Sequence, residues 1–143
     1  MTASRILIDK GAEVFTVSPE DTLVAAAVTL SAHKVGAAVA VDADGKPVGV
    51  FSERDLAKAV SAHGAAALEK TVGEVMSTDL VSASPSTSID TLMGLMTDRR
   101  VRHVLVLEGG SLAGVVSIGD VVKRKIAEAE AEAESLKAYI EGA

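Results

Sequence analysis

Residues 49–55 have the sequence GVFSERD, and residues 114–120 repeat it as GVVSIGD, with glycine, serine and aspartate at the same spacing. Upstream of each motif, Ser18-Pro19 returns as Ser84-Pro85, so the likeness covers a whole unit. The copies lie 66 residues apart before the first turn of the unit and 65 apart after it. One residue is therefore missing from a turn of the second copy, where a shared fold tolerates a change in length. The sequence predicts two copies of one small fold.

The composition restricts what this fold can contain and bind. Apolar residues make up 48% of the 143 residues but aromatic residues only 2%, so the core must be aliphatic, and so must the walls of any pocket for a base. The net charge of −6, with no basic stripe, opposes contact with a phosphate backbone and excludes nucleic acid as the expected partner. Cysteine is absent, which excludes disulfide bonds, thiolate zinc sites and cysteine nucleophiles.

The N-terminal segment and the hydropathy predict a cytoplasmic protein. Residues 1–5 lead into an apolar run of only three residues, far shorter than the core of a signal peptide. No stretch approaches the roughly 18 apolar residues that span a membrane, so no membrane partner is expected.

Each copy shows the same order of local signals. A Ser-Pro pair favours extended backbone before it, and an amphipathic helix follows. A short apolar run then predicts a strand buried on both faces, and a glycine-containing turn joins it to a second strand as an antiparallel hairpin. A further helix begins at each Ser-x-x-Asp sequence. The expected elements are a helix over 23–34, strands over 37–41 and 48–51 and a helix over 53–62 in the first copy, and a helix over 89–99, strands over 104–107 and 112–116 and a helix from 118 onward in the second.

Several smaller features complete the expected fold. Asp21 or Thr22 can cap the first helix. In the second copy, Met93 and Met96 have the spacing typical of core methionines. Residues 2–7 and 71–76 form a similar lead-in before each copy, and residues 64–70 are expected to connect the halves.

The Ser-x-x-Asp sequence of each copy has two interpretations. In the first, Ser52 and Ser117 are N-caps, and Asp55 and Asp120 complete capping boxes three residues later. In the second, the start of a helix that follows a sheet strand presents free backbone amides to an anion, while an aspartate there accepts the hydroxyls of a ribose. The two roles are compatible, and the second predicts a nucleotide site.

The whole unit resembles a known family. The two Ser-Pro pairs, the apolar strands and above all GVFSERD and GVVSIGD are similar to a pair of cystathionine β-synthase (CBS) domains, which form a Bateman module, and the resemblance covers about residues 2–127. It implies an α/β (α+β) fold of two pseudo-symmetric CBS repeats, each a small three-stranded sheet with helices. It also implies a regulatory module that binds AMP, ADP, ATP, NAD or S-adenosylmethionine in clefts between the repeats.

The resemblance also implies which residues bind the ligand. Asp55 and Asp120 would hold ribose hydroxyls, with Ser52 and Ser117 near the ribose or phosphate. The residues expected to line the adenine side, or to contact the base and phosphate just ahead of the buried strands, are Thr16, Val35, Gly36 and Ala37 in the first copy and Ser82, Val101, Arg102 and His103 in the second.

The two sites are expected to be unequal. Arg54 beside Asp55 could approach a phosphate, whereas Gly119 in the second copy cannot. Conversely, Arg99, Arg100, Arg102 and His103 precede the second buried strand, where the first copy has His33, Lys34, Gly36 and Ala37. A solvated basic face explains Arg99 and Arg100 equally well.

Other chemistries have little support in the sequence. His33, His63 and His103 are isolated, without ligand spacing for a metal, so no metal and no catalytic cofactor are expected. Neither Ser52 nor Ser117 has a histidine nearby in the sequence to act as a base. We therefore expect a protein that is not an enzyme.

The C-terminal segment lies outside the repeat and predicts a helix to about residue 141. A heptad stripe runs along it, through Val122, Ile126, Ala129, Ala133, Leu136 and Ile140. The helix either packs on its own domain or is partly frayed, or it forms a homodimer contact, in which an antiparallel partner would place residues 123–125 near the acidic residues 130–134.

The expected domains are residues 1–70, with the first repeat, its lead-in and the connector; residues 71–127, with the second repeat; and residues 128–143, the helical extension. The expected function is a sensory or regulatory homodimer that binds AMP, ATP, NAD or a similar ligand and acts on a protein target. The alternative is a structural or partner-binding dimer whose clefts are unoccupied.

Overall fold

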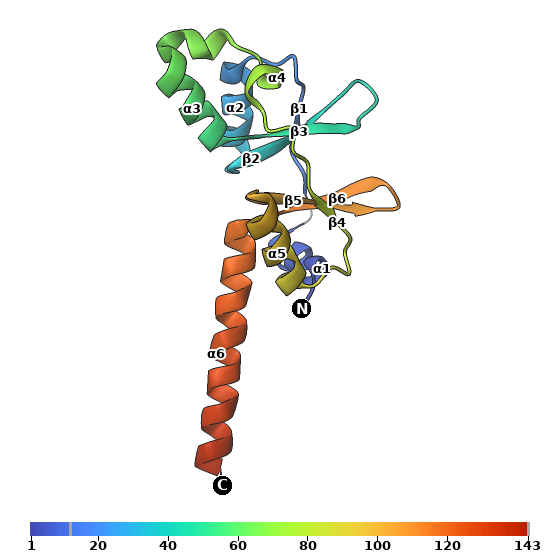
Figure 1. Cartoon of the computed structure of the whole chain (residues 1–143), viewed down its shortest axis with the longest axis vertical. Coiled ribbons are helices and arrows are strands. Elements are labelled where there is room, and N and C mark those ends of the chain that lie inside the picture. Colours follow the sequence, from blue (N-terminus) through green and yellow to red (C-terminus); the bar gives the residue numbers. More distant parts are fainter. Residues whose placement is uncertain (12, 143) are drawn as a thin grey trace. The chain divides into compact units, whose positions relative to one another are not determined.

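The computed structural model describes residues 1–11 and 13–142. The chain divides into two compact units (Figure 1). We call Glu13–Leu80 the first-copy unit, and Met1–Ala12 together with Val81–Ala143 the second-copy unit. The repeats suggest a division between residues 70 and 71, but the compact units divide the chain differently because each includes the lead-in of the other copy.

The first-copy unit holds a three-stranded sheet in the order β1-β2-β3. Strand β1 pairs in parallel with β2, and β2 pairs antiparallel with β3. The elements are β1 (Thr16–Val17), α2 (Leu23–His33), β2 (Ala37–Val41), β3 (Pro47–Ser52), α3 (Glu53–His63), a 3₁₀ helix η1 (Gly64–Glu69) and α4 (Val72–Val75). The expected connector 64–70 is thus largely this 3₁₀ helix, and its Ala67 is fully buried.

The second-copy unit repeats this arrangement with the order β4-β5-β6. Strand β4 is parallel to β5, and β6 is antiparallel to it. The elements are α1 (Ala3–Lys10), β4 (Ser82–Ala83), α5 (Ile89–Arg99), β5 (His103–Glu108), β6 (Ser111–Ser117) and α6 (Ile118–Gly142). The expected fold of two three-stranded sheets with helices and a C-terminal helix is confirmed.

Matching caps begin and end the first long helix of each copy. The Thr22 hydroxyl accepts a hydrogen bond from the amide of Ala25 at 3.2 Å, and the Ser88 hydroxyl accepts one from the amide of Thr91 at 3.1 Å. Both helices are followed by a C-cap residue in the left-handed conformation, Lys34 after α2 and Arg100 after α5. Of the two expected caps for α2, Thr22 is the one observed.

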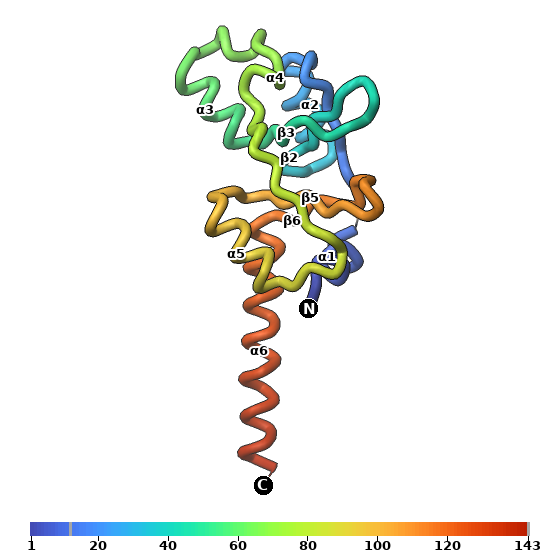
Figure 2. Tube along the Cα trace, turned by 45° about the vertical axis from the view of Figure 1, so that its right-hand side comes forward, coloured from blue at the N-terminus to red at the C-terminus, as the bar shows by residue number. Residues whose placement is uncertain are grey.

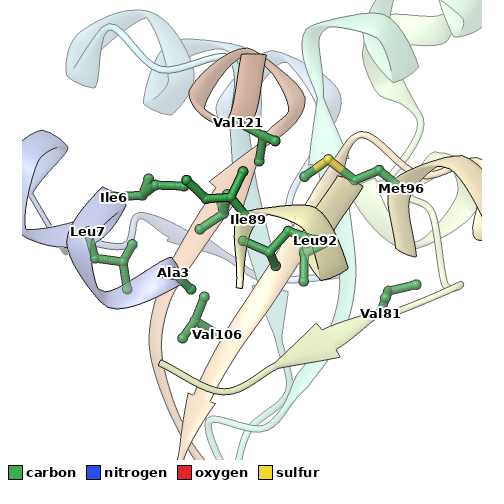
Figure 3. Close-up of a cluster of buried hydrophobic side chains, with 11 residues drawn as sticks. Ala3, Ile6, Leu7, Val81, Ile89, Leu92, Met96, Val106 and Val121 are labelled. Carbon is green, nitrogen blue, oxygen red and sulfur yellow. The ribbon is translucent and has the colours of Figure 1, made fainter. Parts of the chain in front are cut away.

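An aliphatic core fills the second-copy unit (Figure 3). Helix α1 contributes Ile6 and Leu7, and α5 contributes Leu92 and Met96. The prediction that Met93 belongs to this core is wrong, because 38% of its surface is exposed. Helix α5 packs through one side only, and Met93 lies outside that side.

The lead-in segments are exchanged between the copies. Helix α1 precedes the first copy but packs on the second, where the amide of Ala3 donates to the carbonyl of Thr87 at 2.9 Å. Helix α4 precedes the second copy but packs on the first, where the amide of Val72 donates to the carbonyl of Asp21 at 2.8 Å. Each unit is therefore built from both sides of the repeat boundary.

A glycine in each sheet provides room for the exchanged segment. A Cβ added at Gly114 would lie 2.6 Å from Cδ2 of Leu7, and one added at Gly49 would lie 2.4 Å from Sδ of Met76. These are the glycines that begin the GVVSIGD and GVFSERD motifs. Their lack of a side chain is what lets the lead-ins approach so closely.

Helix α6 extends well beyond the other elements of its unit (Figure 2). Val121 near its start is buried, but the heptad stripe further along is exposed, with 54% of Ile126, 60% of Leu136 and 67% of Ile140 accessible. The alternative in which the whole stripe packs on its own domain is thereby wrong for the single chain. No helix of the described residues is long and apolar enough to span a membrane.

Substitution of Gly114 by Ala should lower the free energy of unfolding by about 1–3 kcal/mol, because the new methyl group would overlap the buried Leu7 side chain. Urea unfolding measures the change. The matched control is Gly94→Ala in α5, where a Cβ meets nothing within 4 Å and should be neutral or stabilising. Adding Leu7→Ala should make the Gly114→Ala change much less harmful, and equal losses in both backgrounds would contradict the packing argument.

Candidate functional site

Each Ser-x-x-Asp sequence lies where the last strand of a sheet passes directly into a helix. In the first-copy unit, the Ser52 hydroxyl accepts from the amide of Asp55 at 3.3 Å, and Oδ2 of Asp55 accepts from the amide of Ser52 at 2.9 Å. In the second-copy unit the corresponding distances between Ser117 and Asp120 are 3.2 and 2.8 Å. The capping boxes expected from the sequence are thus present in both copies.

The sheets bring the start of the buried strand next to this junction. Ala37 pairs with Ser52 across the antiparallel ladder, and His103 pairs with Ser117. The carbonyl of Gly36 accepts from the amide of Glu53 at 2.9 Å, and the carbonyl of Arg102 accepts from that of Ile118 at 2.8 Å. In each copy, the predicted site residues just ahead of the buried strand therefore lie next to the Ser-x-x-Asp motif.

The third predicted position lies one strand further away. Thr16 on β1 pairs with Val39 of β2, and Ser82 on β4 pairs with Leu105 of β5. Thr16 is exposed and lines a cavity of about 530 Å³ with the turn residues 17–21 and residues 41–43. The structure confirms that Thr16 and Ser82 begin their strands but does not place them against the motifs.

The two oxygens of each motif carboxylate differ in their bonding. In both copies Oδ2 accepts the capping amide, and in the first copy it also accepts the Ser52 hydroxyl at 3.0 Å. Among the described residues, Oδ1 of Asp55 and Oδ1 of Asp120 receive no hydrogen bond. Capping therefore uses one oxygen and leaves the other as an acceptor, so the two interpretations of the motif are structurally compatible.

The carboxylate of Asp120 also forms an ion pair that the sequence analysis did not identify. Nζ of Lys10, at the end of α1, lies 2.7 Å from Oδ2 of Asp120 and 3.0 Å from the carbonyl oxygen of Val115. Partial burial of Asp120 favours a raised pKa, but the hydrogen bonds from Lys10 and Ser117 outweigh it and hold the pKa below its usual value. At neutral pH this carboxylate is ionised and available as an acceptor.

A cavity lies beside the motif helix in each unit, at equivalent places. In the first-copy unit it measures about 210 Å³ and is lined by Asp55, Lys58, Ala59, His63 and Val75. In the second-copy unit it measures about 310 Å³ and is lined by Ile6, Asp9, Lys10, Asp120, Lys123, Arg124 and Ala127. The second cavity is larger and more heavily charged.

The first junction also carries charged side chains that the second junction lacks. Arg54 is exposed and forms no ion pair among the described residues. Its neighbour Glu53 approaches Gly36, since a Cβ there would lie 3.8 Å from Oε2 of Glu53. The second copy has the uncharged Ile118 in place of Glu53. An acidic side chain therefore stands at the first junction and none at the same place in the second.

Two contacts were not identified from the sequence, each for a different reason. Lys10 lies 110 residues from Asp120, and only the exchange of the lead-ins brings them together. His33 was noted as an isolated histidine, but its ring stacks on Phe15 with centroids 3.9 Å apart. The pairing of the few aromatic rings in an aliphatic chain could have been suspected from composition alone. No group of three metal-binding side chains occurs in the described parts of the chain.

Known proteins resemble this chain in both sequence and fold. The CBS domain family matches the sequence twice, over residues 7–62 and 72–126. CBS domain-containing protein CBSX3, mitochondrial, of Arabidopsis thaliana is 35% identical over 127 residues, and the match spans 86% of this chain but only 62% of that relative. The crystal structure of the CBS-domain containing protein ATU1752 from Agrobacterium tumefaciens is 48% identical, with a TM-score of 0.81 over 87% of this chain and 92% of that one. The CBS domain protein PAE2072 from Pyrobaculum aerophilum, complexed with AMP, is 26% identical, with a TM-score of 0.73 over 84% of this chain and 89% of that one.

Substitution of Asp120 by Asn should lower the free energy of unfolding at pH 7 by about 1 kcal/mol, because the negative charge at the start of the helix and its ion pair with Lys10 are lost. The pKa of Asp120 is lowered in the folded chain, so its stabilising contribution is complete above the usual value of 3.8 and is lost as the pH falls through the lowered value. Urea unfolding at pH 7 and pH 3 should therefore show a smaller difference between variant and wild type at pH 3. Asp44→Asn, in an exposed turn, is the control, and a pH-independent difference for Asp120→Asn would contradict the assignment.

Proposed function

Because the chain belongs to the CBS domain family and carries two of its repeats, we propose that it is a regulatory module, without catalytic activity, that binds an adenosyl ligand at its two Ser-x-x-Asp junctions. The observation that carries this proposal is the pair of motif carboxylates. Each lies at the start of a helix and beside a cavity, and the hydrogen bonds described for it fall on Oδ2 and not on Oδ1. A carboxylate in that position suits the vicinal hydroxyls of a ribose.

The relatives support the ligand class. The Pyrobaculum protein is complexed with AMP, and its chain aligns over 84% of this one. AMP, ATP and NAD all carry an adenosine whose ribose could bind Asp55 or Asp120. The aliphatic residues just ahead of β2 and β5, Val35 and Val101, would then contact the base, in keeping with a chain that has few aromatic rings.

The roles proposed for the remaining residues follow from their places. Gly36, Ala37, Arg102 and His103 lie at the starts of β2 and β5 beside the motif serines, and would contact base or phosphate. Arg54 is the exposed cation of the first junction and would meet a phosphate there. Thr16 and Ser82 would line the adenine side from the first strands.

A regulatory output requires that the ligand distinguish two states of the protein. A ligand that binds two conformations equally well shifts no equilibrium, however tightly it binds. The module would therefore act on a protein target only if its occupied and empty states differ in free energy at that contact. The target would be a protein, because the net charge of −6 opposes nucleic acid.

A second candidate function, a homodimer that binds through α6, is favoured by one observation. The heptad stripe on α6 is exposed, and an exposed apolar stripe along a helix is typical of a coiled-coil contact. Arg124 pairs with Asp9 and Lys125 with Asp90 at 2.8 Å within the same chain, so Lys123 is the residue of 123–125 left to meet the acidic residues 130–134 of an antiparallel partner. The two functions are compatible, and the second alone would leave the carboxylates without a ligand.

AMP, ATP or NAD should raise the melting temperature of the wild-type protein if the proposal holds. Asp55→Asn and Asp120→Asn should each weaken binding at their own site by about 1.5–3 kcal/mol, because asparagine lacks the charged acceptor but still caps the helix. Calorimetric titration measures the affinities. Thr22→Ala is the matched control, since it removes an N-cap that belongs to neither motif. Unchanged affinity in both Asn variants would return the motif to a purely capping role.

Removal of the residues after Ala127 should weaken a homodimer if the stripe on α6 forms its contact. In the full-length chain, Leu136→Asp combined with Ile140→Asp should do the same, because both introduce charge into the stripe. Sedimentation velocity reports the mass. Ala138→Asp, which the heptad places opposite the stripe, is the control. An unchanged mass in the truncated and doubly substituted proteins would remove α6 from the interface.

A further inference from the structure

Lys10 marks the sharpest chemical difference between the two copies. The lead-ins align so that Thr2 corresponds to Thr71 and Leu7 to Met76, which places Lys10 opposite Asp79. The likeness ends there, because α1 continues to Lys10 whereas α4 ends at Val75, so the first-copy unit has no helical residue in the place of Lys10. The exchange of the lead-ins brings this cation to the motif of the second copy.

The contacts of Lys10 hold its ammonium at the proposed ribose acceptor. Nζ donates to Oδ2 of Asp120 at 2.7 Å and to the carbonyl of Val115 at 3.0 Å. An ammonium has three N–H donors, so one has no acceptor among the described residues. In the first-copy unit the equivalent oxygen of Asp55 accepts the uncharged hydroxyl of Ser52 instead. Of the two junctions, the second therefore has a lysine ammonium in direct contact with its carboxylate.

The surrounding cavity adds to this positive charge. Arg124, which lines the same cavity, is paired with Asp9, and the ammonium of Lys10 is paired with Asp120. Lys123 lines it as well and forms no ion pair within the described part of the chain. The first-copy cavity has the apolar Ala59 in the place of Arg124. The second cavity therefore has an excess of positive charge on its walls.

We propose that Lys10 makes the second-copy site select adenosyl ligands with a negatively charged 5′ group, a phosphate, over neutral adenosine and over the cationic S-adenosylmethionine. This inference rests on the proposed function, because it assigns the ligand class of the same site. One of the two vicinal hydroxyls of a ribose can bind the free Oδ1 of Asp120, but the other competes with Lys10 for Oδ2, and a charge-assisted hydrogen bond is costly to break without replacement. A phosphate on the ligand gives the displaced ammonium a new partner, whereas adenosine gives it none and a sulfonium repels it.

The flexible lysine side chain suits this exchange of partners. Its charge is compact and sits on a stem of four carbons, so Nζ can move from the carboxylate to a nearby anion while the backbone of α1 stays in place. The side chain is 38% exposed, which leaves it room to turn. The first-copy site has no cation paired with its carboxylate, so a preference for a phosphate there would come from Arg54 and would not involve exchange at Asp55.

Isothermal titration calorimetry of the Asp55→Asn protein, in which the second-copy site remains intact, tests the inference with adenosine, AMP and S-adenosylmethionine as probes. In that background, Lys10→Met should weaken AMP binding by about tenfold or more and leave adenosine binding equal or tighter. Lys10→Arg keeps the charge and should keep the preference for AMP. Lys46→Met is the matched control, because Lys46 is an exposed lysine that lines neither cavity.

The outcomes separate this inference from the proposed function. If the Asp55→Asn protein binds these probes but Lys10→Met leaves the ratio of AMP to adenosine affinity unchanged, the selection by Lys10 is overturned and the adenosyl site stands. An equal loss for all three probes has the same meaning, since Lys10 would then only hold the site together. If neither the wild-type nor the Asp55→Asn protein binds any of the three, nor ATP or NAD, the proposed function falls and the inference with it.

Discussion

The packing of each lead-in segment against a glycine of the opposite copy is the contact on which the rest of the structure depends. Leu7 lies so close to Gly114 that a single added carbon would overlap it, and Met76 has the same relation to Gly49. The contact anchors α1 to the sheet of the second copy and α4 to that of the first. Because the glycine lies within the strand that leads into the motif helix, the same few residues determine the core of each unit and the position of its Ser-x-x-Asp junction.

This exchange explains why two similar sequences build two different sites. Had each lead-in packed on its own copy, Lys10 would belong to the unit of Asp55. Instead it pairs with Asp120, at a junction with the uncharged Ile118 and Gly119, while the first junction has Glu53 and Arg54. The duplicated backbone supplies the same cap, strand pairing and helix start twice. The charged residues around this backbone are not the same in the two copies. These residues decide how the junctions differ.

Local signals predicted the elements well because each depends on neighbours in the chain. Helix α2 begins at Leu23 because Thr22 caps it, and the strands follow their apolar runs to within a residue or two. Spacing alone does not give the width of the buried face of a helix, and the prediction for Met93 in α5 is wrong for this reason. The motif aspartates were found from spacing, and their capping bonds follow from it. Lys10 could not be found in this way, since its partner is fixed by tertiary packing and by no local pattern.

A capping box is sometimes taken as an argument against a binding role, but the geometry of these two carboxylates removes the conflict. The cap needs one oxygen, and the bond to the serine amide holds the other in a fixed direction at the start of the helix. A carboxylate without that bond could turn among several rotamers and would lose entropy on binding a ligand. The cap therefore orders the acceptor in advance, at the positive end of the helix where an ionised group is also stabilised. In the second copy Lys10 lowers the pKa of the same carboxylate further, so the features that stabilise the fold there also keep the acceptor charged.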